Sequence, residues 1–191
     1  MVKMSLAPTI TIDPYPGQYE FTTTTKGGIK IFVRPIKPED APLLVELFHT
    51  LSKESIYYRF FRPMKFLSPD MLAYFTQIDY DRAIALVALD KTHPTERMLG
   101  VARVMSFPDS KAAEIAVTVG DPWQGEGIGE ALMKHIIIIS KERGKETLLG
   151  YVLRENTHML NLAEKLGFTF SWNHERGQHE IKADLRTLSL V

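Results

Sequence analysis

A β-branched run that stops at a glycine-rich turn constrains this chain more than any other feature. Residues 113–119 read Ala-Glu-Ile-Ala-Val-Thr-Val, which is typical of a strand with a single carboxylate, Glu114. After a Pro-marked turn, Gly125, Gly127 and Gly129 lead into a long segment with helical apolar spacing. A strand, a glycine-rich turn and a helix start present backbone N–H groups and a positive helix end to a phosphate. The motif therefore predicts a phosphate site with a carboxylate beside it.

Composition narrows the class of protein. The chain has 191 residues, 45% of them hydrophobic, which suffices for one good core or for one domain with an arm. The 23 Lys and Arg balance the 23 Asp and Glu, so no basic field points to nucleic acid and no polybasic run to a membrane. The absence of cysteine excludes disulfides, thiolate metal sites and cysteine nucleophiles. The longest aliphatic run, Ile136–Ile139, is too short to span a bilayer and no signal peptide is evident, so we expect a cytoplasmic protein.

The order of the expected elements predicts a mixed α/β (α+β) fold. Residues 1–28 are rich in Pro, Thr and Gly, and we expect them to form an arm or linker that can supply one edge strand, ahead of a domain at 29–191. Strands are expected at about 29–33, 83–89, 98–105, 113–119, 147–153, 168–174 and 180–185. Helices are expected at about 38–51, from 52 or 55, from 68, at 127–143 and at 156–166. This order predicts about seven strands in one mixed sheet with helices on both faces.

Two better-known phosphate motifs do not fit the glycine-rich turn. A dinucleotide-binding loop needs a third glycine where this chain has Glu130. A P-loop fits the spacing of Gly120 and Gly125, but it then requires Lys and Ser or Thr where Glu126 and Gly127 stand. Both motifs are excluded, and a tight turn without any ligand is the remaining alternative.

Residues 124–129, Gln-Gly-Glu-Gly-Ile-Gly, resemble the Q/R-x-x-G-x-G/A loop of the GNAT superfamily of acyl-CoA N-acyltransferases. The segment from Asn156-x-x-Met159 to Lys165-Leu-Gly-Phe168 is similar to the second signature of that superfamily. Further segments resemble the GNAT domain of Pat-type bacterial protein lysine acetyltransferases, which modify acyl-CoA synthetases; they lie at 15–16, 34–41, 51–55, 59–61, 78–81, 113–116, 123–125 and 156–159.

This resemblance spans about residues 15–168, nearly the whole chain. Many relatives carry a fused synthetase-like or cyclic-nucleotide-binding module, and no segment here is long enough to be one. This leaves two interpretations: residues 1–28 are the remnant of a junction to such a module, or the whole chain is a domain excised from a longer protein.

The resemblance implies that a lysine amine attacks the thioester of acetyl-CoA, with no metal taking part. A lysine amine has a reference pKa of about 10.4, so the site must remove a proton before the attack. Glu114 stands at the position of the family's general base. The alternative is an ordinary ion pair between Glu114 and Arg103.

Regular strand alternation divides residues 114–119 between two faces of the sheet. One face would carry Glu114, Ala116 and Thr118, and the other would carry Ile115, Val117 and Val119. Small neighbours leave room for substrate and water beside Glu114, so we expect the first face to be open and the second to be core.

The resemblance also assigns the residues that would bind acetyl-CoA. The backbone N–H groups of Val117 and Val119 would contact the pantetheine and the thioester carbonyl. The N–H groups of Gly125, Gly127, Ile128 and Gly129 would hold the pyrophosphate, and Gln124 would close that loop. Asn156 would contact the pantetheine arm, cap its own helix, or do both.

The acceptor side is less constrained. A lysine-bearing protein calls for acidic groups, so Asp79 and Asp81 are acceptor-site candidates, although capping and loop solvation explain them equally well. Many GNAT enzymes have a tyrosine that protonates the departing thiolate, where this chain has Ala163. A thiol with a pKa of about 8.5 can leave without a strong acid, so water or another side chain can serve. No side chains have the spacing of metal ligands.

Three functions follow from these observations. The first is acetyl transfer from acetyl-CoA to a lysine of a protein, in particular an acyl-CoA synthetase. The second is a GNAT enzyme that acetylates a small amine or amino acid. The third is a weakly catalytic acyl-CoA-binding regulatory module, which is consistent with Ala163 in place of the tyrosine.

Overall fold

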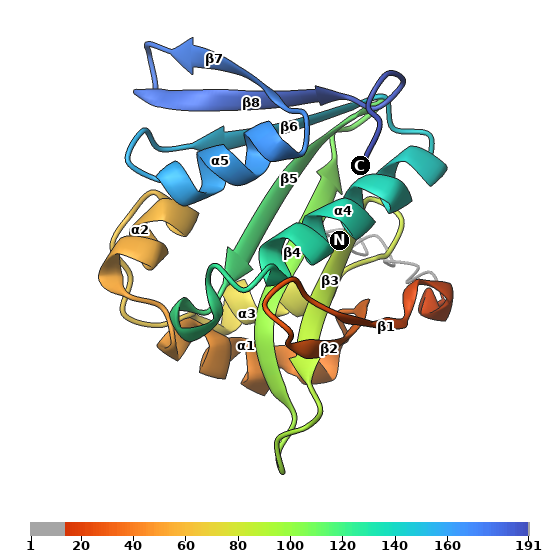
Figure 1. The fold of residues 1–191 in the computed structure, drawn as a ribbon, viewed down its shortest axis with the longest axis vertical. Helices are drawn as coiled ribbons and strands as arrows, with labels where there is room; N and C mark the ends of the chain where they lie inside the picture. Colours follow the sequence, from red (N-terminus) through yellow and green to blue (C-terminus); the bar gives the residue numbers. More distant parts are fainter. Residues whose placement is uncertain (1–13, 191) are drawn as a thin grey trace, which may run out of the picture.

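The computed structural model describes residues 14–190, which form one mixed sheet covered by helices (Figure 1). The sheet has eight strands in the order β1-β2-β3-β4-β5-β6-β8-β7, and all neighbours are antiparallel except β5 and β6. The strands are β1 Phe21–Thr24, β2 Lys30–Pro35, β3 Ala83–Asp90, β4 Arg97–Ser106, β5 Ala112–Val119, β6 Thr147–Val152, β7 Thr169–Asn173 and β8 Gln178–Asp184. The α-helices are α1 Ala41–His49, α2 Lys53–Phe60, α3 Pro69–Thr76, α4 Ile128–Glu142 and α5 Thr157–Lys165, and 3-10 turns lie at Gly17–Tyr19, Pro38–Asp40 and Asp121–Trp123.

The expected mixed α/β sheet is confirmed, with one strand more than the seven predicted. The additional strand is β1, which pairs along its whole length with β2 and forms the edge of the sheet. It lies within the segment expected as an arm. The turn after β1 also contacts the glycine-rich loop, because Gly27 N–H donates to Glu126 O at 3.0 Å. The rest of that arm, residues 1–13, lies outside the described residues.

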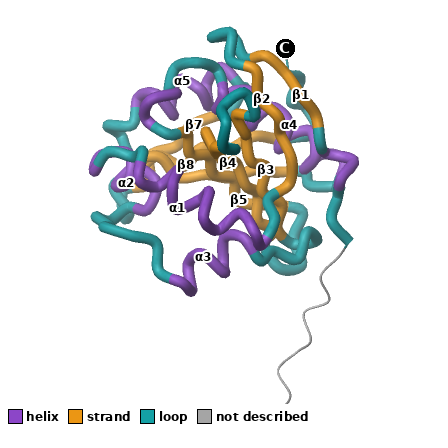
Figure 2. The backbone as a smooth tube through the Cα atoms, turned by 90° about the horizontal axis from the view of Figure 1, so that it is seen from below, coloured by secondary structure: helices purple, strands orange, loops and turns teal. Residues whose placement is uncertain are grey.

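Helices cover both faces of the sheet (Figure 2). Helices α1, α2 and α3 lie on one side, with α1 packed on β4, and α4 packs across β3, β4 and β5 on the other. This double cover explains why β3, an uninterrupted apolar run, is buried along nearly its whole length. On α4, Leu132, Met133, Ile136 and Ile137 are buried at helical spacing. No described helix combines the length and the apolar character needed to cross a membrane.

Side-chain caps begin the short helices where the sequence predicts them. Ser52 Oγ accepts from Ser55 N–H (3.1 Å) at the start of α2, and Ser68 Oγ accepts from Met71 N–H (3.3 Å) at the start of α3. The helix expected at 38–51 is instead a 3-10 turn followed by α1.

A buried ion pair joins that 3-10 turn to the sheet. Arg34, near the end of β2, donates two hydrogen bonds of 2.7 Å to the two carboxylate oxygens of Asp40. Both side chains are buried. Burial opposes the charge of Arg34, but the hydrogen bond to Asp40 raises the pKa of the guanidinium above its ordinary value.

The parallel pairing of β5 and β6 is short. Only Ala112–Glu114 pair with Thr147–Leu149, whereas β5 continues to Val119 against β4. The two strands therefore separate after Glu114 and leave an opening in the sheet.

Candidate active site

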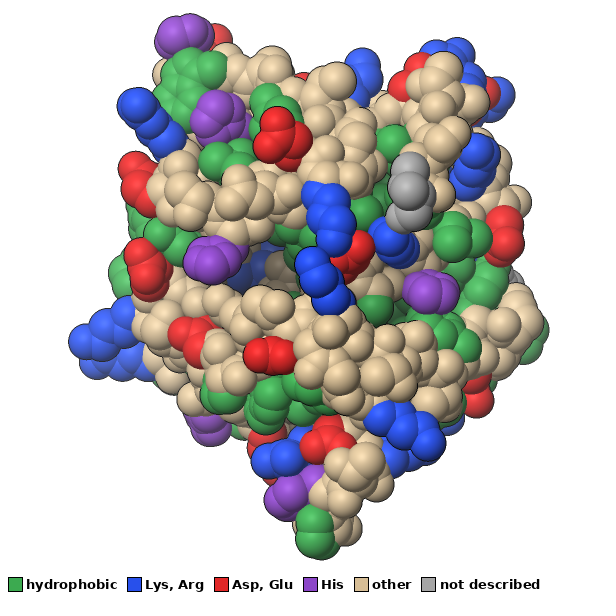
Figure 3. All heavy atoms as spheres, in the orientation of Figure 1, with side chains coloured by type: hydrophobic (Ala, Val, Ile, Leu, Met, Phe, Trp, Pro, Cys, Tyr) green, Lys and Arg blue, Asp and Glu red, His purple; other side chains and the backbone are tan. Residues whose placement is uncertain are grey.

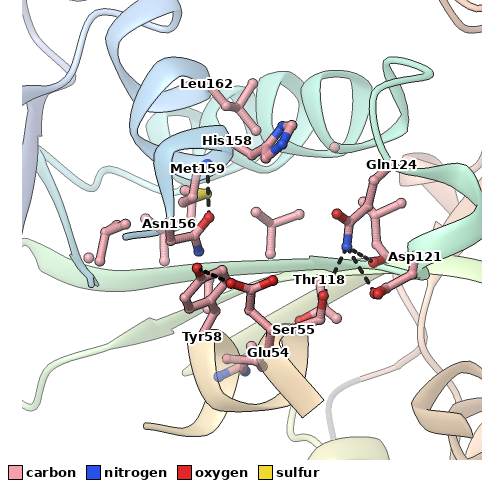
Figure 4. A pocket seen from close by; sticks show the side chains of 18 of the residues that line it. Glu54, Ser55, Tyr58, Thr118, Asp121, Gln124, Asn156, His158, Met159 and Leu162 are labelled. Atoms are coloured by element: carbon pink, nitrogen blue, oxygen red, sulfur yellow. Dashed lines mark hydrogen bonds between the residues drawn. The ribbon is translucent and has the colours of Figure 1, made fainter. Parts of the chain in front are cut away.

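A cleft of about 440 Å³ occupies the opening between β5 and β6 (Figure 4). The end of β5 forms one wall, α2 the second, and the glycine-rich loop with the start of α4 the third. Helix α5 closes the remaining side with Asn156, Met159 and Leu162. On the face shown in Figure 3 the surface is hollowed near its middle, and acidic and basic side chains are mixed around it without a large patch of one sign.

The backbone of β5 offers unpaired N–H groups to this cleft. Gly120 N–H donates to Leu99 O at 2.9 Å, toward β4. Because successive N–H groups of a strand point to alternate edges, those of Val117 and Val119 point to the side that β6 has left. Val119 O faces the same way, since it accepts from the side-chain amide of Gln124 at 3.1 Å. The structure thus aims the two N–H groups predicted to bind the donor into the cleft.

Glu114 lies at the point where the two strands separate. Its side chain is exposed and lines the cleft. The expected alternative, an ion pair with Arg103, is not formed, because Arg103 Nη2 donates to Phe75 O at 3.0 Å instead. Glu114 instead interacts electrostatically with Arg59 of α2. Burial lowers the pKa of the Arg59 guanidinium, and the negative charge of Glu114 offsets part of that shift.

The opposite face of β5 differs from the expectation. Ile115 is buried as predicted, but Val117 and Val119 are only half-buried and line the cleft. The expectation of a core face therefore holds only in part for these two residues, which pack against the core and also face the cleft.

The glycine-rich loop leaves a row of N–H groups without partners. Gly125 (φ 80°) and Gly127 (φ 88°) have left-handed backbone conformations that suit glycine. The first backbone bond into α4 runs from Ala131 N–H to Gly127 O at 3.0 Å. Among the described residues, no carbonyl accepts from the amides of 125–130, as is usual at a helix start. These amides and the positive helix end fit a pyrophosphate.

A carboxylate at this helix start is neutralised by its neighbours. Glu130 lines the cleft and forms ion pairs with Lys165 and, at 3.3 Å, with Lys134. The hydrogen bond from Lys165 is the main reason that the pKa of Glu130 lies below its ordinary value. Its charge is therefore compensated where a phosphate would bind.

Gln124 joins the loop to β5 and to α2. Its Nε2 lies 3.1 Å from Val119 O, 3.1 Å from Asp121 Oδ1 and 3.3 Å from Ser55 Oγ (Figure 4). Asp121 Oδ2 accepts from Ser52 N–H at 3.1 Å, which fixes the start of α2 against the same turn. The sequence predicted the role of Gln124 in closing the loop but missed Asp121 and Ser55.

Asn156 both caps its own helix and lines the cleft, the two positions that the sequence predicted for it. Its Oδ1 accepts from Met159 N–H at 3.1 Å, which caps α5, and the residue also lines the cleft. Across the cleft, the hydroxyl of Tyr58 of α2 donates to Glu54 at 2.7 Å, and Glu155 O lies 3.3 Å from the same hydroxyl as an alternative acceptor. The i, i+3 spacing of Ser55 and Tyr58 on α2 is the signal that could have placed both on this wall.

Comparison with known proteins decides the family. Residues 50–168, more than half of the chain, match the model of the family described as Acetyltransferase (GNAT) family. This chain is a GNAT acetyltransferase. The family uses acetyl-CoA, which agrees with the unpaired amides of the cleft.

Three relatives extend this result. The chain is 30% identical over 141 residues to an acetyltransferase of Pseudomonas aeruginosa, covering 74% of this chain and 76% of the relative. It is 28% identical over 158 residues to acetyltransferase Pat of Mycolicibacterium smegmatis, covering 82% of this chain but only 44% of that relative's length. The crystal structure of the GNAT domain of S. lividans PAT superposes with a TM-score of 0.83 at 30% identity, over 90% of this chain and 99% of that domain.

Ala163, which stands where many GNAT enzymes have a tyrosine, is fully buried and does not line the cleft. A proton donor is therefore missing at this position of α5. Hydroxyl groups at the cleft wall come from other elements instead, among them Tyr58 of α2 and Tyr151 of β6.

Asp79 and Asp81 lie outside the residues that line the cleft. Asp79 Oδ1 accepts from the N–H groups of Asp81 (3.1 Å), Arg82 (2.8 Å) and Ala83 (3.2 Å), so it holds the turn before β3. Burial works against the charge of Asp79, but hydrogen bonds from Arg82 and these amides lower its pKa. The geometry supports the capping role, and a role in acceptor binding stays a prediction. No three His, Asp or Glu side chains of the described residues gather as a metal site would need.

Proposed function

We propose that this GNAT enzyme transfers the acetyl group of acetyl-CoA to a lysine ε-amine of a protein, with an acyl-CoA synthetase as the substrate. The observation that carries the proposal is the single cleft that joins three features. It brings together the unpaired amides of the glycine-rich loop, the unpaired amides of β5 and the carboxylate of Glu114.

Binding of acetyl-CoA follows from the order of these features along the cleft. The amides of Gly125, Gly127, Ile128 and Gly129 hold the pyrophosphate, where the α4 helix end adds partial positive charge. Gln124 keeps that loop against β5.

The pantetheine then runs along the exposed edge of β5. Asn156 lies on the α5 side of this path. The N–H groups of Val117 and Val119 are directed at the thioester carbonyl, where negative charge develops during acyl transfer.

Glu114 acts as the general base. A lysine acceptor arrives as an ammonium ion, and the carboxylate takes its proton, directly or through a water molecule. The amine then attacks the thioester carbonyl carbon, the carbon–sulfur bond breaks, and the departing CoA thiolate takes up the second proton that the nitrogen loses, directly or through water. A thiol with a pKa of about 8.5 needs no strong acid to depart, which is compatible with Ala163 in place of a tyrosine.

A protein acceptor is favoured by the similarity to Pat and to the GNAT domain of PAT. The test combines the purified chain, acetyl-CoA and an acyl-CoA synthetase, with mass spectrometry of the acetylated lysines. A panel of free amines and amino acids is assayed in parallel. Acetylation of free amines alone would replace the protein substrate by a small one. Tight acetyl-CoA binding without transfer to any acceptor would identify a regulatory module.

A further inference from the structure

Two arginines near Glu114, one lining the cleft and one just behind it, form no ion pair in the described structure. Arg103 of β4 is only 8% exposed, and its Nη1 has no hydrogen-bond partner in the described structure. Arg59 of α2 is half-buried and forms no ion pair with the described residues. Each guanidinium instead lies against an aromatic ring, Arg103 at 4.7 Å from Phe75 and Arg59 at 5.3 Å from Phe60. Burial, with the charge of Arg59 as a second cause, lowers the pKa of Arg103 to about 9.

Both arginines are close to Glu114. In the β4–β5 register Arg103 is opposite Ala116, and Glu114 is opposite Met105. Arg103 and Glu114 are therefore diagonal neighbours on the same face of the sheet, a relation that separates residues by about 7–8 Å. Arg59 lines the cleft together with Glu114.

Both arginines line a small cavity under the sheet-covering helices. Its volume is about 30 Å³, and it is lined by Arg59, Arg103, Thr118 and apolar side chains of α1 and α3. Arg59 and Thr118 also line the main cleft, so they form the partition between the two spaces. A volume of this size holds about one water molecule or one small anionic group.

The charges at this end of the cleft call for an anion. A lysine ammonium that approaches Glu114 meets the guanidinium of Arg59 in the cleft and that of Arg103 behind it, and both repel its charge. A buried guanidinium N–H without a partner is also costly, and a carboxylate would satisfy it. We propose that Arg59 and Arg103 form a binding subsite for one carboxylate, carried into the cleft close to the reacting amine.

This subsite rests on the proposed function, which places the acceptor beside Glu114. The carboxylate can belong to the acceptor, as an acidic side chain next to the target lysine or the α-carboxylate of an amino acid. It can also belong to the acyl chain of a dicarboxylic acyl-CoA. The chemistry of recognition is the same in each case, and the source is a matter for experiment.

Bromide is a direct probe of the subsite. Crystals of the whole chain, soaked in sodium bromide, are expected to show an anomalous peak between Arg59 and Arg103. The peak should vanish in Arg103→Met and persist in Arg62→Met, an exposed arginine of the same segment. An ordered water alone at this position would overturn the proposal.

Stability separates a binding role from a structural one. If Arg103 serves a ligand, Arg103→Met should keep or raise the thermal midpoint, because an apolar side chain replaces a buried cation with an unpaired N–H. A fall of the midpoint that Arg103→Lys restores would show that the arginine holds the fold.

Activity then identifies the source of the carboxylate. One arm compares two lysine peptides that differ only in Glu or Gln beside the lysine, and the other compares acetyl-CoA with succinyl-CoA. We expect the substrate with the carboxylate to be preferred by about tenfold in kcat/KM, the size of one charge-assisted hydrogen bond. The preference should disappear in Arg59→Met and Arg103→Met but not in Arg62→Met.

The two proposals fail in different ways. Lysine peptides acetylated without any carboxylate preference in either arm would overturn the subsite and leave the proposed function standing. Transfer to free amino acids but to no lysine peptide, lost in Arg103→Met, would retain the subsite and overturn the protein substrate.

Discussion

Glu114 and Leu149 form the last residue pair of the parallel ladder between β5 and β6. Beyond this pair β5 stays on β4 while β6 turns away, so the carboxylate lies at the vertex of the opening. The proposed base and the exposed backbone edge proposed to bind the thioester are thus adjacent on one strand.

Replacement of the carboxylate by an amide tests the base. Glu114→Gln should lower kcat by about 10²–10⁴-fold, the usual contribution of a general base, while acetyl-CoA binds as before. Steady-state kinetics and calorimetry measure the two quantities. Glu142→Gln, at an exposed position of α4, is the control and should leave both unchanged. Wild-type kcat in Glu114→Gln at saturating substrates would remove Glu114 from the mechanism.

Two glycines at opposite ends of α4 separate donor binding from backbone strain. Gly125 (φ 80°) and Gly144 (φ 73°) both have positive φ, and a Cβ would meet no atom within 4 Å at either. Gly125→Ala and Gly144→Ala should therefore each lose about 1–2 kcal/mol of unfolding free energy. Only Gly125→Ala should weaken acetyl-CoA binding, by about tenfold, because it shifts the amides of the loop.

Urea unfolding and calorimetry on the two glycine variants provide the comparison. Equal effects on acetyl-CoA affinity, or none in Gly125→Ala, would contradict the assignment of the loop to the donor.

The ion pair of Arg34 and Asp40 makes a prediction about stability alone. Asp40→Asn should lower the free energy of unfolding by about 3–5 kcal/mol, because it leaves the buried guanidinium of Arg34 with only the more distant carboxylate of Glu96, at 3.7 Å. The double variant Arg34→Met, Asp40→Leu should lose less than the sum of the single changes. Asp184→Asn, which breaks an exposed pair with Arg186, should shift the urea midpoint far less. Similar shifts for both Asp variants would mean that burial adds nothing to the Arg34–Asp40 pair.

The depressed pKa of Asp90 makes the free energy of unfolding depend on pH in the acidic range. The hydroxyl of Thr92, which donates to Asp90 at 2.6 Å, is the main cause that lowers the pKa of Asp90 from 3.8 to about 2. Arg97 lowers it further, and partial burial of Asp90 opposes the shift. A carboxyl whose folded pKa is depressed stabilises the fold above its unfolded pKa, and this contribution is lost as the pH falls from about 4 to 2.

Thr92→Val should bring the pKa of Asp90 closer to 3.8 and flatten the loss of stability over that pH range. NMR titration of the Asp90 carboxyl and urea midpoints between pH 5 and about 2 measure both effects. An unchanged titration in Thr92→Val would assign the shift to the backbone N–H of Thr92 and to Arg97 instead.

Local signals in the sequence predicted most of the fold. The serine caps of α2 and α3, the apolar stripe of α4 and the alternation in β5 each depend on neighbouring residues, so their positions follow from short-range rules. β1 was expected only as an option, because Phe21–Thr24 is short and gains its order from pairing with β2.

The site was predicted where one continuous segment carries it. Glu114 to Gly129 form the strand, the turn and the helix start, and their relative positions are fixed by the backbone. The exposure of Val117 depends on where β6 diverges, which is a property of a distant strand. Tyr58 had a local signal in its i, i+3 spacing from Ser55, whereas the position of Arg103 beside Arg59 depends on tertiary packing that no local pattern encodes.

The hydrogen bond from Gly27 to Glu126 has a thermodynamic consequence for the donor loop. The β1–β2 turn holds the loop beside Gly127, where an added Cβ would come within 3.1 Å of Lys26 N. The loop therefore loses its conformational entropy when the protein folds, not when acetyl-CoA arrives. If the loop holds the pyrophosphate as proposed, part of that affinity comes from preorganisation by the turn after an edge strand of the sheet.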